Sequence, residues 1–102
     1  MTFERVMGLH VIDDAEYQKY RESMEPILES IGGSFGYDFK ISEVLRSKSK
    51  NEINRVFTIE FPSKQDMEYF FSRPDYTEIQ NRHLNNSVKS KTLISMYEKP
   101  LE

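Results

Sequence analysis

The sequence predicts a single α+β domain over residues 1–102, in which four strands form one antiparallel sheet that carries helices on one face. Four stretches are rich in aliphatic, β-branched and aromatic residues, as strands are. Two other regions repeat apolar residues at steps of three and four, as amphipathic helices do. Because Gly or Pro separates many of these stretches, they follow one another as β-α-β-β-α-β, the order of the ferredoxin-like plait.

The first strand is predicted over residues 5–12 and the first helix over residues 15–31. Asp13-Asp14 supplies the N-cap between them. Gly32-Gly33 ends the helix, where a residue in the left-handed conformation is most easily Gly. The apolar stripe of this helix consists of Tyr17, Tyr20, Met24, Ile27, Leu28 and Ile31.

A long second strand is predicted over residues 34–47, followed by a polar hairpin loop over residues 47–52. Its apolar residues alternate with small or polar ones, which places them on one face of the sheet. These residues are Phe35, Tyr37, Phe39 and Ile41. The third strand, over residues 53–61, ends at Pro62, which cannot continue a central strand.

Ser63 is predicted to cap the second helix, with Asp66 as its acidic partner three residues later. Ser72-Arg73-Pro74 ends this helix, a short helix follows over residues 75–86, and the last strand covers residues 88–98. The apolar side of the helical region contains Met67, Phe70, Phe71, Tyr76 and Ile79, with His83 at the same spacing.

The predicted strands carry apolar residues on both faces, although helices cover only one. Val11, Val56 and the aromatic residues of the second strand therefore need a second cover. A second copy of the chain, with its sheet facing this one, supplies that cover most simply. The sequence thus predicts a homodimer in which two sheets form an α/β barrel.

The composition argues against several classes of function. The formal net charge is −3 and the basic residues are scattered, so no nucleic-acid partner is expected. The chain has no Cys, and its two His are far apart without a spaced carboxylate, so no metal site is expected. No cofactor motif is present, and no stretch approaches the roughly 18 apolar residues of a membrane span, so we expect a cytosolic protein without a cofactor or a membrane partner.

The chain contains the motifs Tyr17-x-x-Tyr20, Gly32-Gly33-x-Phe35, Arg55-x-x-x-Ile59-Glu60-Phe61-Pro62-Ser63 and Pro74-x-Tyr76. In this order they resemble a bacterial family of unknown function, DUF1330, in the dimeric α/β-barrel superfamily that includes the antibiotic-biosynthesis monooxygenases. The resemblance covers nearly the whole chain. It implies a homodimer with a pocket between sheet and helices in each subunit, but it implies no defined activity.

His10 and His83 are candidate catalytic residues. A haem-binding relative in the superfamily would use a His as axial ligand, and a proton-transfer enzyme would use one near neutral pH. The helical spacing of His83 points it toward the sheet. The alternatives are a hydrogen-bonded or half-exposed helix residue for His83 and a strand residue bonded to a carboxylate for His10.

Arg55 is a third candidate, because it shares a strand face with Phe57, which is unusual company for a guanidinium. It either holds the carboxylate of a small acid or pairs with Asp38 or Glu43 on the adjoining strand. The tyrosines either line a pocket or serve as core or interface residues with one hydrogen bond each. The expected ligand-binding set is Tyr17, Tyr20, Met24, Arg55, Phe57, Tyr76 and His83.

Three functional hypotheses follow from the sequence. The first is a homodimer that binds a small apolar or aromatic molecule between sheet and helices. The second is a cofactor-independent monooxygenase or isomerase, in which His83 or His10 moves a proton and Arg55 or a Tyr orients the substrate. The third is a purely structural dimer whose pocket is filled by side chains.

Overall fold

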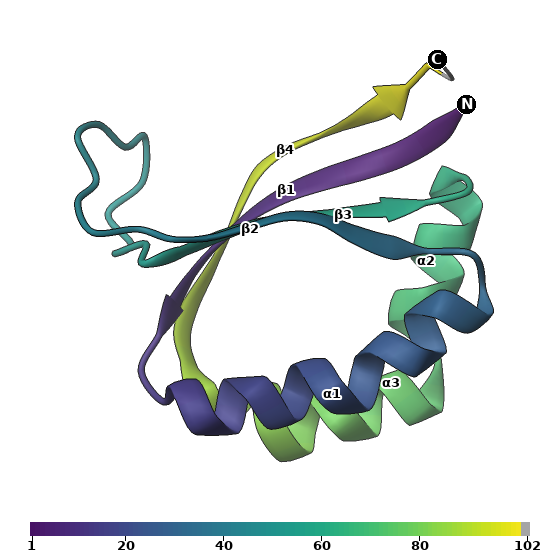
Figure 1. Ribbon diagram of the computed structural model, residues 1–102, viewed down its shortest axis with the longest axis horizontal. Coiled ribbons are helices and arrows are strands. Elements are labelled where there is room, and N and C mark those ends of the chain that lie inside the picture. The colour runs from purple at the N-terminus through teal and green to yellow at the C-terminus, as the bar shows by residue number, and fades with distance from the viewer. Residues whose placement is uncertain (101–102) are drawn as a thin grey trace.

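The computed structural model describes residues 1–100, in which four strands form one antiparallel sheet with the helices on one face (Figure 1). The strands are β1 (Thr2–Val11), β2 (Ser34–Lys40), β3 (Arg55–Phe61) and β4 (Val88–Lys99). The helical segments are α1 (Asp14–Ser30), α2 (Lys64–Ser72), α3 (Pro74–Ile79), the π-helical turn η1 (Gln80–Leu84) and α4 (Asn85–Ser87). In this part of the chain, no helix is long and apolar enough to cross a membrane. The spatial order β2-β3-β1-β4 confirms the predicted ferredoxin-like plait.

Helices α1 and α2 begin at the predicted N-caps. The Asp13 carboxylate accepts a hydrogen bond from the N–H of Glu16 at 3.0 Å, and Ser63 Oγ accepts one from the N–H of Asp66 at 3.1 Å. Each bond satisfies an N–H group that the first helical turn leaves without a partner. After α1, Gly32 has a φ of +83°, the left-handed conformation that favours Gly.

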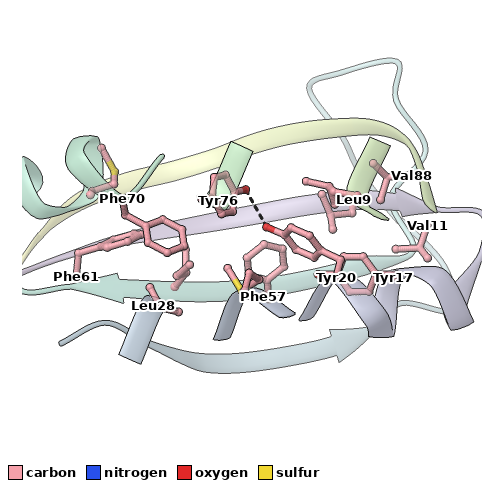
Figure 2. Packing of buried hydrophobic residues seen from close by; sticks show 14 of the residues in the cluster. Leu9, Val11, Tyr17, Tyr20, Leu28, Phe57, Phe61, Phe70, Tyr76 and Val88 are labelled. Atoms are coloured by element: carbon pink, nitrogen blue, oxygen red, sulfur yellow. Dashed lines mark hydrogen bonds between the residues drawn. The ribbon is translucent and has the colours of Figure 1, made fainter. Parts of the chain in front are cut away.

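The helices pack on the sheet through buried aromatic and aliphatic side chains (Figure 2). Phe61 of β3 and Phe70 of α2 are fully buried, with their ring centroids 5.7 Å apart. Leu28 of α1 is buried at the same end of the core, while Val11 and Val88 lie at the other end (Figure 2). The tyrosines of the middle section lie between these two ends.

Alternate residues of β3 face opposite sides of the sheet. Phe57, Ile59 and Phe61 are buried beneath the helices, whereas Val56, Thr58 and Glu60 are partly exposed on the face without helices. We call this second side the open face. Val11 belongs to the helix-side core, because it pairs with Val88 there and is only 7% exposed. The prediction that Val11 needs cover from a second subunit was therefore wrong.

β2 is shorter than the sequence predicts, since it ends at Lys40 and residues 41–54 contain no strand or helix. The chain rejoins the sheet at Asn54, whose side-chain amide bonds both the N–H and the C=O of Val11 at 2.8 Å. A side chain thus satisfies the backbone at the end of β1, where a continued strand would otherwise supply the partners.

A bulge in β2 also changes which residues share a face. The pairing with β3 shifts between Phe35 and Asp38, so Phe35 packs against Phe57 on the helix side. Phe39 pairs with Val56 and stacks on Tyr37, so these two aromatic residues lie on the open face. The prediction that one face holds all the apolar residues of this strand was wrong, because an inserted residue reverses the alternation.

The short helix predicted over residues 75–86 is divided into three segments. It starts with Pro74 at its first turn, a favoured position because Pro has no N–H to satisfy. In η1 the N–H of Asn85 bonds to the C=O of Gln80, five residues back. The wider turn rotates the following residues relative to α-helical spacing. Consequently Leu84, rather than His83, becomes buried.

Candidate functional site

A cavity of about 280 Å³ lies between the sheet and the helices. Apolar side chains form most of its wall: Met7, Leu9, Met24, Phe35, Phe57, Ile59, Phe71 and Leu84. Polar side chains also line it: Arg5, Tyr17, Tyr20, Tyr76, Gln80 and Lys91. A mainly apolar chamber with a few polar groups is the usual form of a small-molecule site.

The periods of strand and helix bring these side chains together. On β1, Arg5 and Met7 are two residues apart and therefore face the helices together. On α1, Tyr17, Tyr20 and Met24 are spaced by three and four residues and face the sheet together. All three α1 residues are buried, as expected for the side of an amphipathic helix that covers a sheet.

Tyr20 of α1 and Tyr76 of α3 meet at the cavity through their hydroxyl groups. The two oxygens are 2.8 Å apart, so one hydroxyl donates a hydrogen bond to the other (Figure 2). Burial raises the pKa of Tyr20 well above its usual range, and burial also raises the pKa of Tyr76. Both hydroxyls therefore remain protonated, and available as donors, at neutral pH.

Arg5 places a guanidinium in the cavity wall. Its central carbon lies 4.8 Å from the centroid of the Phe71 ring, a cation–π distance. Its Nε is buried and has no hydrogen-bond partner within residues 1–100. Burial lowers the pKa of Arg5, as expected where a charge loses solvation without a counter-ion at contact.

Lys91 of β4 adds a second cation at the cavity. The residue is exposed on its outer side, yet its side chain contributes to the lining. Partial burial lowers the pKa of Lys91 from its usual value. Gln80, at the start of η1, brings an amide group to the same cavity.

Arg55 lies outside this cavity and is bound to an acid. Its Nε and Nη2 donate to the two oxygens of Asp38 at 2.7 and 2.8 Å. Arg21 Nη2 lies 3.3 Å from the same carboxylate. The hydrogen bond from Arg55 lowers the pKa of Asp38, so the carboxylate stays ionised. Arg55 is therefore paired with Asp38 on the adjoining strand, which is the alternative to ligand binding that the sequence left open. It lies beside a separate hollow of about 150 Å³.

Neither histidine lines the cavity. His83 Nδ1 lies 2.6 Å from Glu16 Oε1, which ties η1 to the first turn of α1. His10 Nε2 lies 3.2 Å from Glu52 Oε2 in the loop after β2. Within residues 1–100, no group of three or more candidate metal ligands gathers at one place.

The cavity brings together only part of the ligand-binding set predicted from the sequence. Tyr17, Tyr20, Met24, Phe57 and Tyr76 line it, whereas Arg55 and His83 do not. Sequence reasoning missed Arg5, Gln80 and Lys91. Arg5 could have been found from its position in the sequence, because it lies at two-residue spacing with Phe3, Met7 and Leu9. It therefore shares the helix-facing side of β1 with them.

Together, the strand order and the cavity between sheet and helices define a ferredoxin-like domain with a candidate small-molecule site. Residues 5–97 match DUF1330, a domain of unknown function, and the chain belongs to this family. No curated protein matches the chain in sequence.

Several solved structures share the fold. A protein of unknown function from Rhodopseudomonas palustris is 20% identical with a TM-score of 0.80, over 99% of this chain and 83% of that one. A dimeric protein of unknown function with a ferredoxin-like fold from Bacteroides fragilis is 16% identical with a TM-score of 0.54, over 96% of each chain. SnoaB, a cofactor-independent oxygenase from Streptomyces nogalater, is 12% identical with a TM-score of 0.57, over 99% of this chain and 93% of that one. At these identities the similarity concerns the fold alone.

The hydroxyl pair can be tested with a double-mutant cycle. We expect Tyr20→Phe and Tyr76→Phe each to lower the free energy of unfolding by about 1–3 kcal/mol, because each leaves a buried hydroxyl without its partner. The double variant should cost less than the sum of the two single variants. Urea unfolding at one fixed protein concentration measures these values, with the exposed Tyr69→Phe as the control. Additive losses would show that the two hydroxyls do not interact.

The Asp38 ion pairs predict a dependence of stability on pH. We expect Asp38→Asn to lower the free energy of unfolding by about 1 kcal/mol at pH 7, the upper end for partly exposed ion pairs. Because the folded-state pKa of Asp38 is lowered, its contribution is complete above the unfolded-state pKa of about 3.9 and is lost as the pH falls through the folded-state value.

Urea unfolding of the wild type and of Asp38→Asn between pH 7 and pH 3 measures this difference. Glu78→Gln is the matched control, because the Glu78–Arg82 pair is exposed on both sides and should contribute only about 0.3–0.5 kcal/mol. A difference that stays constant down to pH 3 would exclude ionised Asp38 as its source.

Proposed function

We propose that this protein binds a small apolar or aromatic molecule in the cavity between sheet and helices. The observation that carries the proposal is the cavity itself, about 280 Å³ within a wall of aromatic and aliphatic side chains. Ligand pockets commonly measure about 300–1,000 Å³, so this one suits a molecule of one or two rings. Protein interiors are otherwise closely packed, and a chamber of this size in a domain of 102 residues calls for an explanation.

We further propose that the protein forms a homodimer through the open face of the sheet. On this face Tyr37 is 68% exposed and Phe39 is 52% exposed, and their stacked rings lie beside Val56. Large adjacent apolar side chains on a solvent-facing sheet commonly mark a protein contact. The dimeric neighbour from Bacteroides fragilis has a fold compatible with this assembly.

A cofactor-independent oxygenase or isomerase is the second candidate. The fold shared with SnoaB favours it, and the paired Tyr hydroxyls beside a guanidinium could orient a substrate oxygen. We place it second because the residues that line the cavity include no His, Asp or Glu from the described part of the chain. A purely structural dimer comes third, because side chains do not fill the space between sheet and helices.

Ligand binding is tested with a neutral aromatic probe, 2-naphthamide. We expect NMR titration to shift backbone resonances of residues around the cavity. Met7→Phe should weaken binding by about tenfold or more, because the larger ring occupies part of the space and excludes probe contact worth more than about 1.4 kcal/mol. Gln18→Phe, on the exposed side of α1, should bind as the wild type does. Equal binding by both variants would place the probe elsewhere.

Assembly is tested by sedimentation at micromolar concentration. We expect a dimer for the wild type and a monomer for Val6→Glu, which places a charge on the open face at the centre of the sheet. Gln18→Glu adds the same charge on the far side of α1 and should remain dimeric. A wild type that sediments as a monomer would contradict the assembly.

A further inference from the structure

We propose that the molecule bound in this cavity carries a carboxylate, held by Arg5 and the Tyr20–Tyr76 hydroxyl pair, with Lys91 at the rim. This inference rests on the proposed binding function and adds the chemical class of the ligand: a small aromatic or apolar acid. Three features of the cavity support it: an unmet donor on Arg5, an unmet donor on the Tyr pair, and the positive charge that Lys91 adds to that of Arg5.

The first feature is the guanidinium of Arg5. Buried N–H groups in folded proteins almost always have an acceptor, so one without an acceptor calls for an explanation. Arg5 Nε is buried and has no acceptor within residues 1–100. Its guanidinium is fixed over the ring of Phe71, and Phe71 lies edge-on to Tyr76 at a centroid distance of 5.3 Å. A ligand acceptor near Arg5 would therefore lie beside the Tyr pair.

The second feature is the count of hydrogen atoms in the hydroxyl pair. Two hydroxyl groups carry two hydrogens, and one hydrogen bond between them uses only one. The hydrogen of the accepting hydroxyl is left free, and no other acceptor for Tyr20 or Tyr76 hydroxyl occurs within residues 1–100. A group that only accepts hydrogen bonds would satisfy this donor and the Arg5 N–H together. An ionised carboxylate has that property.

The third feature is charge. Four of the other five arginines lie beside carboxylates: Arg21 and Arg55 beside Asp38, Arg73 beside Asp75, and Arg82 beside Glu78. The fifth, Arg46, is exposed in the loop after β2. Arg5 and Lys91 have no such partner in the described residues, and no carboxylate from those residues lines their cavity. In a chain with a formal net charge of −3, two unpaired cations at one apolar chamber favour an anionic ligand.

The geometry also limits the rest of the ligand. The remaining wall is made of flat or flexible apolar side chains such as Phe57, Met24 and Leu9, which suit an aromatic body. The exposed position of Lys91 places the second cation where an acid would enter or leave. A molecule with one acidic end and one aromatic end satisfies both parts of the cavity.

A matched pair of probes tests the inference: 2-naphthoate, which is anionic at pH 7, and 2-naphthamide, which has the same ring system and no charge. Isothermal titration calorimetry on the full chain at low and high salt gives both affinities. We expect the acid to bind about tenfold tighter or more, because hydrogen bonds to a charged group are stronger than neutral ones. Added salt should reduce the difference between the two affinities, because it screens the charge of Lys91 at the rim.

Variants assign the effect to the cavity. Arg5→Met should lower the affinity for 2-naphthoate by about tenfold while changing that for 2-naphthamide by less than about threefold. Lys91→Met should lower the acid affinity by a smaller factor, since this side chain is partly solvated. Lys89→Met is the control, because Lys89 is an exposed residue of the same strand outside the cavity wall. If Arg5→Met fails to fold, the two wild-type affinities and the acid affinity of Lys91→Met decide whether the cavity binds a carboxylate.

The outcomes separate this inference from the proposed function. Equal affinity for the two probes would overturn the carboxylate assignment and leave small-molecule binding intact. A preference for the acid that Lys89→Met abolishes as fully as Lys91→Met and Arg5→Met would also overturn it, because the effect would then be one of general charge. No binding of either probe would overturn both the inference and the proposed function.

Discussion

The hydrogen bond between Tyr20 and Tyr76 is the contact on which the cavity depends. It joins α1 to α3 on the helix side of the sheet, and within residues 1–100 each hydroxyl has the other as its hydrogen-bond partner. Because buried polar groups require partners, the two helices must stay far enough apart for two phenol rings to meet by their ends. The space beside those rings remains open to a small molecule. Aliphatic residues at both positions would let the helices approach the sheet without that constraint.

Two arginines lie on the helix-facing side of the sheet, and they differ in whether a carboxylate of the chain binds them. Arg55 is bound by both oxygens of Asp38, so its charge fixes β3 to β2 and is not free for a ligand. Arg5 lies on the neighbouring strand β1 with an aromatic ring as its contact and a buried N–H without an acceptor. Arg55, the arginine that the sequence singles out, is thus explained by its ion pair with Asp38. Arg5, which keeps a buried N–H without an acceptor among the described residues, lies at the cavity.

The element order, the caps at Asp13 and Ser63 and the family could be predicted from the sequence, because they depend on local patterns and motifs. The bulge in β2 and the early end at Lys40 could not, since both depend on pairing with β3 and on the Asn54 side chain. The π turn likewise changed which residues face inward, replacing His83 by Leu84. The tyrosines of the site followed from helical spacing. Arg5 and Lys91 required knowledge of which strand residues meet beneath the helices.

The most direct test is a crystal structure of the protein with 6-bromo-2-naphthoate, whose bromine can be located by anomalous scattering. We expect one molecule between sheet and helices, with its ring system against Phe57 and Met24. Its carboxylate should lie within hydrogen-bond distance of Arg5 Nε and of the Tyr20–Tyr76 pair. A carboxylate directed away from Arg5 would contradict the recognition described for the acid. A ligand bound only outside the cavity, or a cavity closed by its own side chains, would contradict the binding function itself.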